Sequence, residues 1–136
     1  MLYMIDGSPC SGKSTLASLL ARKYDLLHIK LDDLVDEMMS QASVDSRPIC
    51  LLRQDRNPEQ IWMRNPEEMA DEEWRFYEEI FPYVKSYLIK NQDRPLLVEG
   101  AGLLPHLVKE LEWPASSYLC LTPTADFQKK HYKQRE

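Results

Sequence analysis

The feature that most constrains the fold is a glycine-containing segment close to the start of the chain. The stretch DGSPCSGKST, Asp6 to Thr15, contains the pattern G-x-x-x-x-G-K-[ST] and directly follows the apolar run LYMI. Leucine and alanine side chains recur after it at helical spacing, which predicts a helix from about Lys13 to Tyr24. A strand before the pattern and an amphipathic helix after it are the context that the pattern requires.

The residue types in this segment suit the binding of phosphate groups. Glycines let the backbone curl so that several N–H groups point at phosphate oxygens, and the helix that follows adds its positive N-terminal end. Lys13 would reach the β- and γ-phosphates, the Ser14 hydroxyl would hold Mg²⁺, and Thr15 would help with the α-phosphate. We therefore predict a site for a nucleotide triphosphate with Mg²⁺, formed by Gly7, Ser8, Cys10, Ser11, Gly12, Lys13, Ser14 and Thr15.

Three further apolar runs predict strands that alternate with helices. They are LLHIKL at residues 26–31, RPLLVEG at residues 94–100, and the run inside SSYLCLTP. This order predicts an α/β fold with a mostly parallel sheet, in which ligands bind beyond the carboxyl ends of the strands. The first three strands each end in a polar or glycine-rich motif, so we expect these motifs to open onto one cleft.

The middle of the chain has a different character. Residues 43–66 are polar and contain several prolines, which predicts loops and short helical pieces. Residues 67–90 return to a helical pattern, which Pro82 should interrupt or kink. The sequence shows no repeat, linker or low-complexity segment, so we expect a single domain over residues 1–136.

Acidic residues follow the second and third predicted strands. Asp32 and Asp33 stand where a carboxylate could orient, and deprotonate, an accepting hydroxyl group; the alternative is that they cap and open the following helix. Asp36 and Glu37 are interpreted as solvated helix residues. Glu99 ends an apolar strand, where a second carboxylate would support the Mg²⁺ ion; the alternative is an ordinary strand-ending turn.

Composition argues against two classes of partner. The formal net charge is −5, and no basic stripe runs through the sequence apart from KKHYKQR near its end, so we do not expect a nucleic acid. No apolar run approaches the roughly 20 residues of a membrane span, and no secretion signal is visible, so we expect a cytoplasmic protein. The cysteines lack metal-ligand spacing and are interpreted as reduced thiols, with Cys10 as a loop filler rather than a redox switch.

Taken together, these residues resemble the small P-loop kinases that phosphorylate metabolites and drugs, such as shikimate, gluconate, uridine and nicotinamide riboside kinases and chloramphenicol phosphotransferase. GSPCSGKST resembles their nucleotide loop, LDDLVDEM their second-strand motif, and LLVEGAGLLP the strand with Glu-Gly of uridine-kinase-like proteins. The resemblance implies a three-layer α/β/α fold, ATP as nucleotide, and Asp32 as the base with Asp33 second. TPTADFQKKHYKQRE resembles the start of a lid helix, at about residues 124–136, with Lys130 and Arg135 as candidates to contact the transferring phosphate.

The resemblance does not extend over residues 43–90, where the family carries a variable helical insert that binds substrate. Arginine and tryptophan side chains in this part would suit an anionic or ring-bearing substrate, or they serve packing and surface charge; they are Arg53, Arg56, Trp62, Arg64, Trp74 and Arg75. The family also has a fifth core strand after the lid, which this sequence lacks.

Two functional hypotheses follow. The first is a Mg-dependent, ATP-dependent kinase that acts on a hydroxyl group of a small molecule. The alternative is a non-catalytic or regulatory nucleotide-binding protein. A GTPase switch is disfavoured because the guanine-reading motif N-K-x-D does not occur.

Overall fold

A computed structural model describes residues 1–134 of the 136-residue chain. It divides into two compact units. The first, here called the sheet unit, consists of Met1–Asp32 and the chain from Lys90 onward. The second, the helical unit, is Asp33–Ile89. The segment expected to be a helical insert therefore belongs to a unit that begins about ten residues earlier than the sequence suggested.

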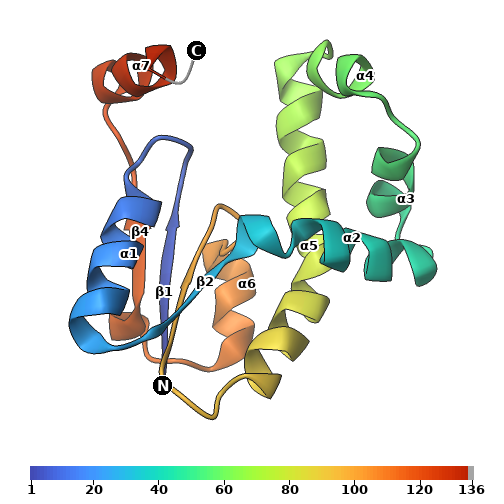
Figure 1. Cartoon of the computed structure of the whole chain (residues 1–136). Coiled ribbons are helices and arrows are strands. Elements are labelled where there is room, and N and C mark those ends of the chain that lie inside the picture. Colours follow the sequence, from blue (N-terminus) through green and yellow to red (C-terminus); the bar gives the residue numbers. More distant parts are fainter. Residues whose placement is uncertain (135–136) are drawn as a thin grey trace. The chain divides into compact units, whose positions relative to one another are not determined.

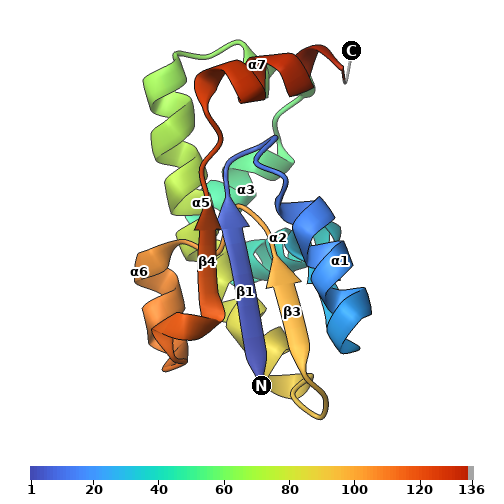
Figure 2. The same ribbon diagram turned by 90° about the vertical axis from the view of Figure 1, so that its left-hand side faces the viewer.

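The sheet unit is built on four strands in the order β2-β3-β1-β4. Every neighbouring pair is parallel, so the expectation of an α/β fold with a parallel sheet is confirmed. Figure 2 shows β3, β1 and β4 side by side, with their arrowheads pointing the same way. The strands are β1 (Leu2–Gly7), β2 (Leu27–Lys30), β3 (Leu96–Glu99) and β4 (Tyr118–Leu121).

The sheet carries helices on both faces. α1 (Lys13–Tyr24) packs its buried Ala17 and Ala21 against Ile5 of β1 and Leu97 of β3. Met4 points to the opposite face because side chains alternate along a strand, and it shares a small cavity with residues of α6 (Pro105–Val108). α1 and α6 accordingly lie on opposite sides of β1 in Figure 1. This arrangement is compatible with a three-layer α/β/α fold.

The rest of the sheet unit consists of short helical elements. The 3-10 turns Lys109–Leu111 (η2) and Ala115–Ser117 (η3) lie within it, and a further one, Leu31–Asp33 (η1), ends at the first residue of the helical unit. The expected helix near the end is present as α7 (Ala125–Lys133). Its first turn is capped by Thr124, whose hydroxyl oxygen accepts a hydrogen bond of 3.3 Å from the backbone N–H of Phe127.

The helical unit confirms the expected short helices followed by a long one. Its elements are α2 (Val35–Val44), α3 (Pro48–Gln54), α4 (Pro58–Trp62) and α5 (Pro66–Lys90). Pro82 does not end the last helix, because α5 continues through it, and the expected kink stays a prediction. Pro82 is exposed, whereas its neighbours Phe81 and Val84 are buried, so the packing of this helix outweighs the backbone hydrogen bond that proline forfeits.

Two contacts show how the helical unit is held together locally. The Glu79 carboxylate accepts hydrogen bonds of 2.9–3.0 Å from the backbone N–H groups of Ile49 and Cys50, in the first turn of α3. Asn57 and Gln60 form a reciprocal capping box at the start of α4. Among the described residues, no helix has the length and apolar character needed to cross a membrane.

Candidate functional site

The loop between β1 and α1, Gly7–Gly12 and here called the glycine loop, needs glycine at two positions. Gly7 has a φ of 154°, and a Cβ atom there would lie 2.4 Å from the backbone oxygen of Leu121. Gly12 has a φ of 86° immediately before the first residue of α1, although a Cβ there would meet nothing within 4 Å. Cys10 also has a positive φ, 60°, and is buried. The sharp course of this loop therefore has a steric basis at Gly7 and a conformational basis at Gly12.

Three of the predicted phosphate-binding residues form the first turn of α1. Ser14 and Thr15 are exposed there, and the Lys13 ammonium group donates a hydrogen bond of 3.2 Å to the carbonyl oxygen of Ser8. The backbone N–H of Ser11 also donates to the Ser8 carbonyl, at 3.3 Å. The Ser11 hydroxyl oxygen is buried and has no hydrogen-bond partner among the described residues. An unpartnered polar atom is costly to bury, so this hydroxyl is available to a polar ligand of the loop.

Glu99 lies on the face of the sheet that carries α1. It pairs in register with Ile5 of β1, and Ile5 packs against α1. The carboxylate is only 3% exposed, and its Oε1 atom lies 3.9 Å from Nε2 of His28. That nitrogen is buried without a hydrogen-bond partner in the described chain. Sequence reasoning assigned no role to His28, although the alternation of side chains along β2 would have placed it on this face.

The two aspartates after β2 lie in the 3-10 turn η1, and both are exposed. The alternative that they cap the following helix is wrong. α2 begins at Val35, its N-cap residue is Leu34, and no side chain caps it. Neither Asp32 nor Asp33 therefore caps α2. Asp36 and Glu37 occupy the first turn of α2 and are exposed, as expected.

A cavity of about 520 Å³ borders the glycine loop. On one side it is lined by Cys10, Gly12 and Thr15 of the loop region together with Leu16 and Leu19 of α1. On the other side lie Phe127 and His131 of α7, whose ring centroids are 4.2 Å apart at an angle of 41°. The Gln128 side-chain amide donates a hydrogen bond of 3.1 Å to the Pro9 carbonyl oxygen, which attaches α7 to the loop. The cavity thus combines loop backbone, aliphatic side chains and an aromatic pair.

Of the two lid candidates, the structure describes only Lys130. Lys130 lies on α7, is exposed, and is not among the described residues that line the cavity. Arg135 lies outside the described residues.

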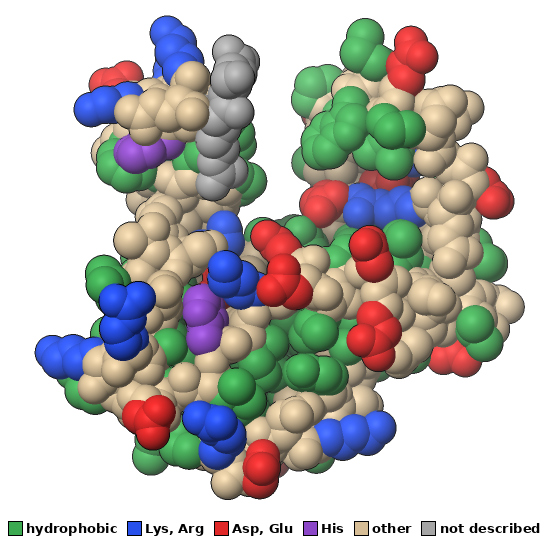
Figure 3. All heavy atoms as spheres, in the orientation of Figure 1, with side chains coloured by type: hydrophobic (Ala, Val, Ile, Leu, Met, Phe, Trp, Pro, Cys, Tyr) green, Lys and Arg blue, Asp and Glu red, His purple; other side chains and the backbone are tan. Residues whose placement is uncertain are grey.

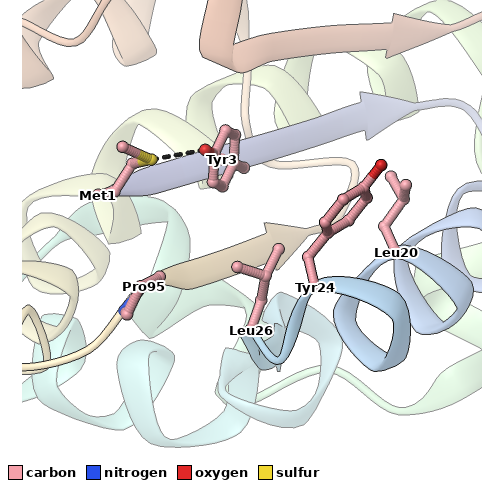
Figure 4. Close-up of a pocket in the computed structure, with 6 residues that line it drawn as sticks. All are labelled: Met1, Tyr3, Leu20, Tyr24, Leu26 and Pro95. Carbon is pink, nitrogen blue, oxygen red and sulfur yellow. Dashed lines mark hydrogen bonds between the residues drawn. The ribbon is translucent and has the colours of Figure 1, made fainter.

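A second cavity of the sheet unit, about 480 Å³, lies at the other end of α1. Figure 4 shows its lining from β1, α1 and the segments before β2 and β3, namely Met1, Tyr3, Leu20, Tyr24, Leu26 and Pro95. The Tyr3 hydroxyl donates to the sulfur of Met1, and the remaining lining is largely apolar. Its described lining contains no lysine, arginine or acidic side chain.

Several arginines of the helical unit donate hydrogen bonds to the same carboxylate, that of Glu72. Glu72 of α5 is buried and accepts hydrogen bonds of 2.6 Å from both Arg56 and Arg64, and one of 3.3 Å from Arg53. Burial alone would raise the pKa of Glu72, but these guanidinium groups outweigh it and lower the pKa. Arg53 also pairs with Glu73 and stacks over the Phe76 ring at 3.9 Å. Blue and red side chains lie together over this part of the surface in Figure 3.

For some of these arginines, the contacts distinguish packing and surface charge from substrate binding. For Arg53, Arg56 and Arg64 the structure shows an ion network that ties the ends of α3 and α4 to α5. Arg56 and Arg64 also line a cavity of about 350 Å³ together with Arg75, but Glu68, Asp71 and Glu72 line it as well. Trp62 and Trp74 are exposed, and Trp74 donates its indole N–H to Glu78 at 3.1 Å.

A buried carboxyl group stands directly before the glycine loop, and sequence reasoning gave it no role. Asp6 is 6% exposed, and its Oδ2 atom lies 3.0 Å from the Tyr118 hydroxyl oxygen and 3.9 Å from the Cys120 sulfur. Burial raises the pKa of Asp6, against the opposing effects of the Gly7 backbone N–H, Tyr118 and Lys13. Its position at the end of β1 was the available signal, since strand ends carry the ligand-binding groups in such sheets.

The described residues include no group of three or more histidine, cysteine, aspartate or glutamate side chains that could hold a metal ion by themselves. A scan of the sequence against protein-family models gives no match, and a search of curated proteins gives none either.

Proposed function

We propose that this protein is a Mg-dependent, ATP-dependent phosphotransferase that acts on a hydroxyl group of a small molecule. The observation that carries the proposal is the glycine loop, which joins a buried strand to a helix at the carboxyl edge of a fully parallel sheet and places Lys13, Ser14 and Thr15 in the helix's first turn. Ligands of such sheets bind at this edge, and a helix N-terminus attracts phosphate groups. ATP rather than GTP is taken from the resemblance in sequence.

The residues present fit the nucleotide. The buried Ser11 hydroxyl lacks a partner in the described chain, so it is free to donate a hydrogen bond to a phosphate oxygen. The Lys13 ammonium group, which now donates to the Ser8 carbonyl, can exchange that neutral acceptor for a charged phosphate oxygen. The cavity beside Gly12 and Thr15 would take the ring system of the nucleotide against Phe127 and His131.

The residues also fit a magnesium ion of the kind that keeps most of its water ligands. Such ions need one or two oxygen groups from the protein, together with phosphate oxygens, rather than a cage of side chains. Ser14 offers an exposed hydroxyl at the start of α1, and Glu99 offers a carboxylate on the same face of the sheet. When bound, the ion would neutralise charge on the β- and γ-phosphates.

The proposed transfer moves the γ-phosphoryl group to the oxygen of the acceptor. A bond forms between that oxygen and the γ-phosphorus, while the bond from the γ-phosphorus to the oxygen bridging it to the β-phosphate breaks, and ADP leaves. Asp32 accepts the proton of the acceptor hydroxyl, and Asp33 is the second candidate. Lys13 stabilises the charge that collects on the phosphate oxygens.

The test separates binding from transfer. Thermal unfolding with Mg-ATP and with Mg-GTP measures binding, because a ligand that binds only the folded state raises the melting temperature. We expect a rise with ATP that Lys13→Ala abolishes. ADP release with pooled hydroxyl-bearing metabolites then measures transfer. We expect Asp32→Asn to lower turnover about a hundredfold with ATP binding kept.

Asp36→Asn is the matched control, because Asp36 is also an exposed aspartate, in the first turn of α2, and the proposal gives it no role. Equal turnover in the Asp32→Asn and Asp36→Asn variants would refute Asp32 as the base. Binding of ATP without transfer to any acceptor pool would favour the alternative of a non-catalytic nucleotide-binding protein. If neither ATP nor GTP raised the melting temperature, both the phosphotransferase and the non-catalytic nucleotide-binding protein would be refuted.

A further inference from the structure

The Tyr118 hydroxyl lies within hydrogen-bond distance of two oxygen atoms. Its oxygen is 3.0 Å from Oδ2 of Asp6 and 2.9 Å from the carbonyl oxygen of Leu103. A phenol has one hydrogen to donate, a carbonyl has none, and an ionised carboxylate has none. With Asp6 ionised, one of the two close oxygen pairs would therefore have no hydrogen between its atoms.

A proton on Asp6 satisfies every atom of this group. The Asp6 carboxyl then donates to the Tyr118 oxygen, and the Tyr118 hydroxyl donates to the Leu103 carbonyl. The other groups that face Asp6 are compatible with this chain: the Cys120 thiol can donate to the carboxyl group, and so can the backbone N–H of Gly7. The positive charge of Lys13 opposes protonation, while the burial of Asp6 favours it.

The chain of hydrogen bonds ends on the turn that follows Glu99. This turn begins at Gly100, whose backbone N–H donates a hydrogen bond of 3.1 Å to the Ile5 carbonyl oxygen, and it ends at Leu103, which is fully buried. A Cβ atom at Gly100 would lie 2.7 Å from that of Leu31, so the turn also passes close to the residue before Asp32. The turn is thus attached to β1 at its start, and through Tyr118 to Asp6 and β4 at its end.

We propose that Asp6 is held as the neutral acid and, through Tyr118, acts as a positioning residue that fixes the turn after β3 and with it the Glu99 carboxylate. The part of this proposal that concerns Glu99 as a magnesium-supporting group rests on the proposed function. The protonation of Asp6 and the attachment of the turn do not, because they concern only the folded chain.

The first measurement follows the Asp6 carboxyl carbon by NMR in protein labelled with ¹³C-aspartate, with Asp6→Asn used to assign the signal. We expect the Asp6 signal to remain that of the acid well above about pH 4, where a free aspartic acid side chain has lost its proton. Loss of the Asp6 proton at about pH 4, as for a free aspartic acid side chain, would overturn the proposal.

The second measurement is amide hydrogen exchange at Gly100 and Leu103. Tyr118→Phe and Asp6→Ala should accelerate it roughly tenfold, as expected for the loss of about one net hydrogen bond. Asp6→Asn should not, because its amide donates to Tyr118 as the acid does. Tyr3→Phe is the control, since it removes a tyrosine hydroxyl from the opposite face of β1. Unchanged exchange in both Asp6→Ala and Tyr118→Phe would overturn the positioning role.

The third measurement is the Mg²⁺ concentration that gives half-maximal stabilisation by ATP. Tyr118→Phe should raise it about tenfold or more, as for other residues that orient a metal-supporting group, while Tyr3→Phe and Asp6→Asn leave it unchanged. An unchanged Mg²⁺ requirement in Tyr118→Phe would refute the link to Glu99. If the wild-type protein binds no nucleotide, the proposed function fails, and the first two measurements still decide the state and role of Asp6.

Discussion

Replacing Glu72 by glutamine should destabilise the helical unit strongly, although the two side chains have nearly the same shape. The carboxylate accepts two hydrogen bonds of 2.6 Å and two of 3.3 Å from Arg53, Arg56 and Arg64. An amide offers one acceptor oxygen and presents N–H groups to cations, so the guanidinium groups lose their counter-charge. Removing one partner of a buried ion pair costs about 3–5 kcal/mol. The arginine side chains are 15–20% exposed, so water can partly solvate them, and we expect the lower end of this range.

The assay is urea unfolding followed by tryptophan fluorescence, with Trp62 and Trp74 as reporters inside the helical unit. Glu73→Gln is the matched control. Glu73 is the neighbouring carboxylate, is half exposed and pairs with Arg53, so its loss should cost less than about 1 kcal/mol. Equal free energies of unfolding in the two variants would refute the argument that the Glu72 network stabilises the unit.

The same network predicts the direction of a pH effect. The pKa of Glu72 in the folded protein is lowered from an ordinary value of 4.5. The stabilisation is therefore present in full above that ordinary value and is lost as the pH falls through the folded-state pKa, because the unfolded chain takes up the proton first. The difference in unfolding free energy between wild type and Glu72→Gln should shrink below about pH 4.5. A difference that grows on acidification would contradict this assignment.

Two further predictions concern the sheet unit and the cysteines. Gly7→Ala should lower the free energy of unfolding by about 1–3 kcal/mol, and by more than Gly12→Ala does. Of these two glycines, only Gly7 would gain a Cβ that collides with backbone, 2.4 Å from an oxygen atom. Urea unfolding of both variants tests this, and the opposite order would show that φ alone decides the cost. Iodoacetamide at pH 8 should alkylate Cys120 far faster than Cys50. Cys120 is exposed, whereas Cys50 is buried, and its burial, with Glu79 beside it, raises the pKa of Cys50 to about 12. Mass spectrometry of the modified peptides measures the order, and preferential modification of Cys50 would contradict the packing around α3.

Local patterns predicted the elements well. The helix expected over Lys13–Tyr24 has those bounds in the structure, and the helix expected near the end of the chain is present. Pro82 did not end its helix, because the burial of its neighbours in a long helix outweighed the lost backbone hydrogen bond, and a kink there stays a prediction. The capping alternative for Asp32 and Asp33 also failed, since the helix begins a few residues later than the acidic pair.

The arginines of the helical unit could not be interpreted from sequence. Their spacing along the chain resembles a row of surface cations, and nothing in it indicates that three of them meet on Glu72. The carboxylate lies 8 to 19 residues from its partners, on a different helix or turn. Such contacts depend on how α3, α4 and α5 pack, which no local pattern contains.

The sequence alone determined the strand, the glycine loop and the helix that starts with Lys13, because hydrophobic periodicity and the conformational freedom of glycine act over a few neighbouring residues. Only the tertiary structure decided the strand order, the face on which Glu99 lies, and the meeting of Asp6 with Tyr118, 112 residues further along the chain. The physical reason is that a one-residue shift in strand register turns every side chain to the other face, and that register is set by contacts between distant segments.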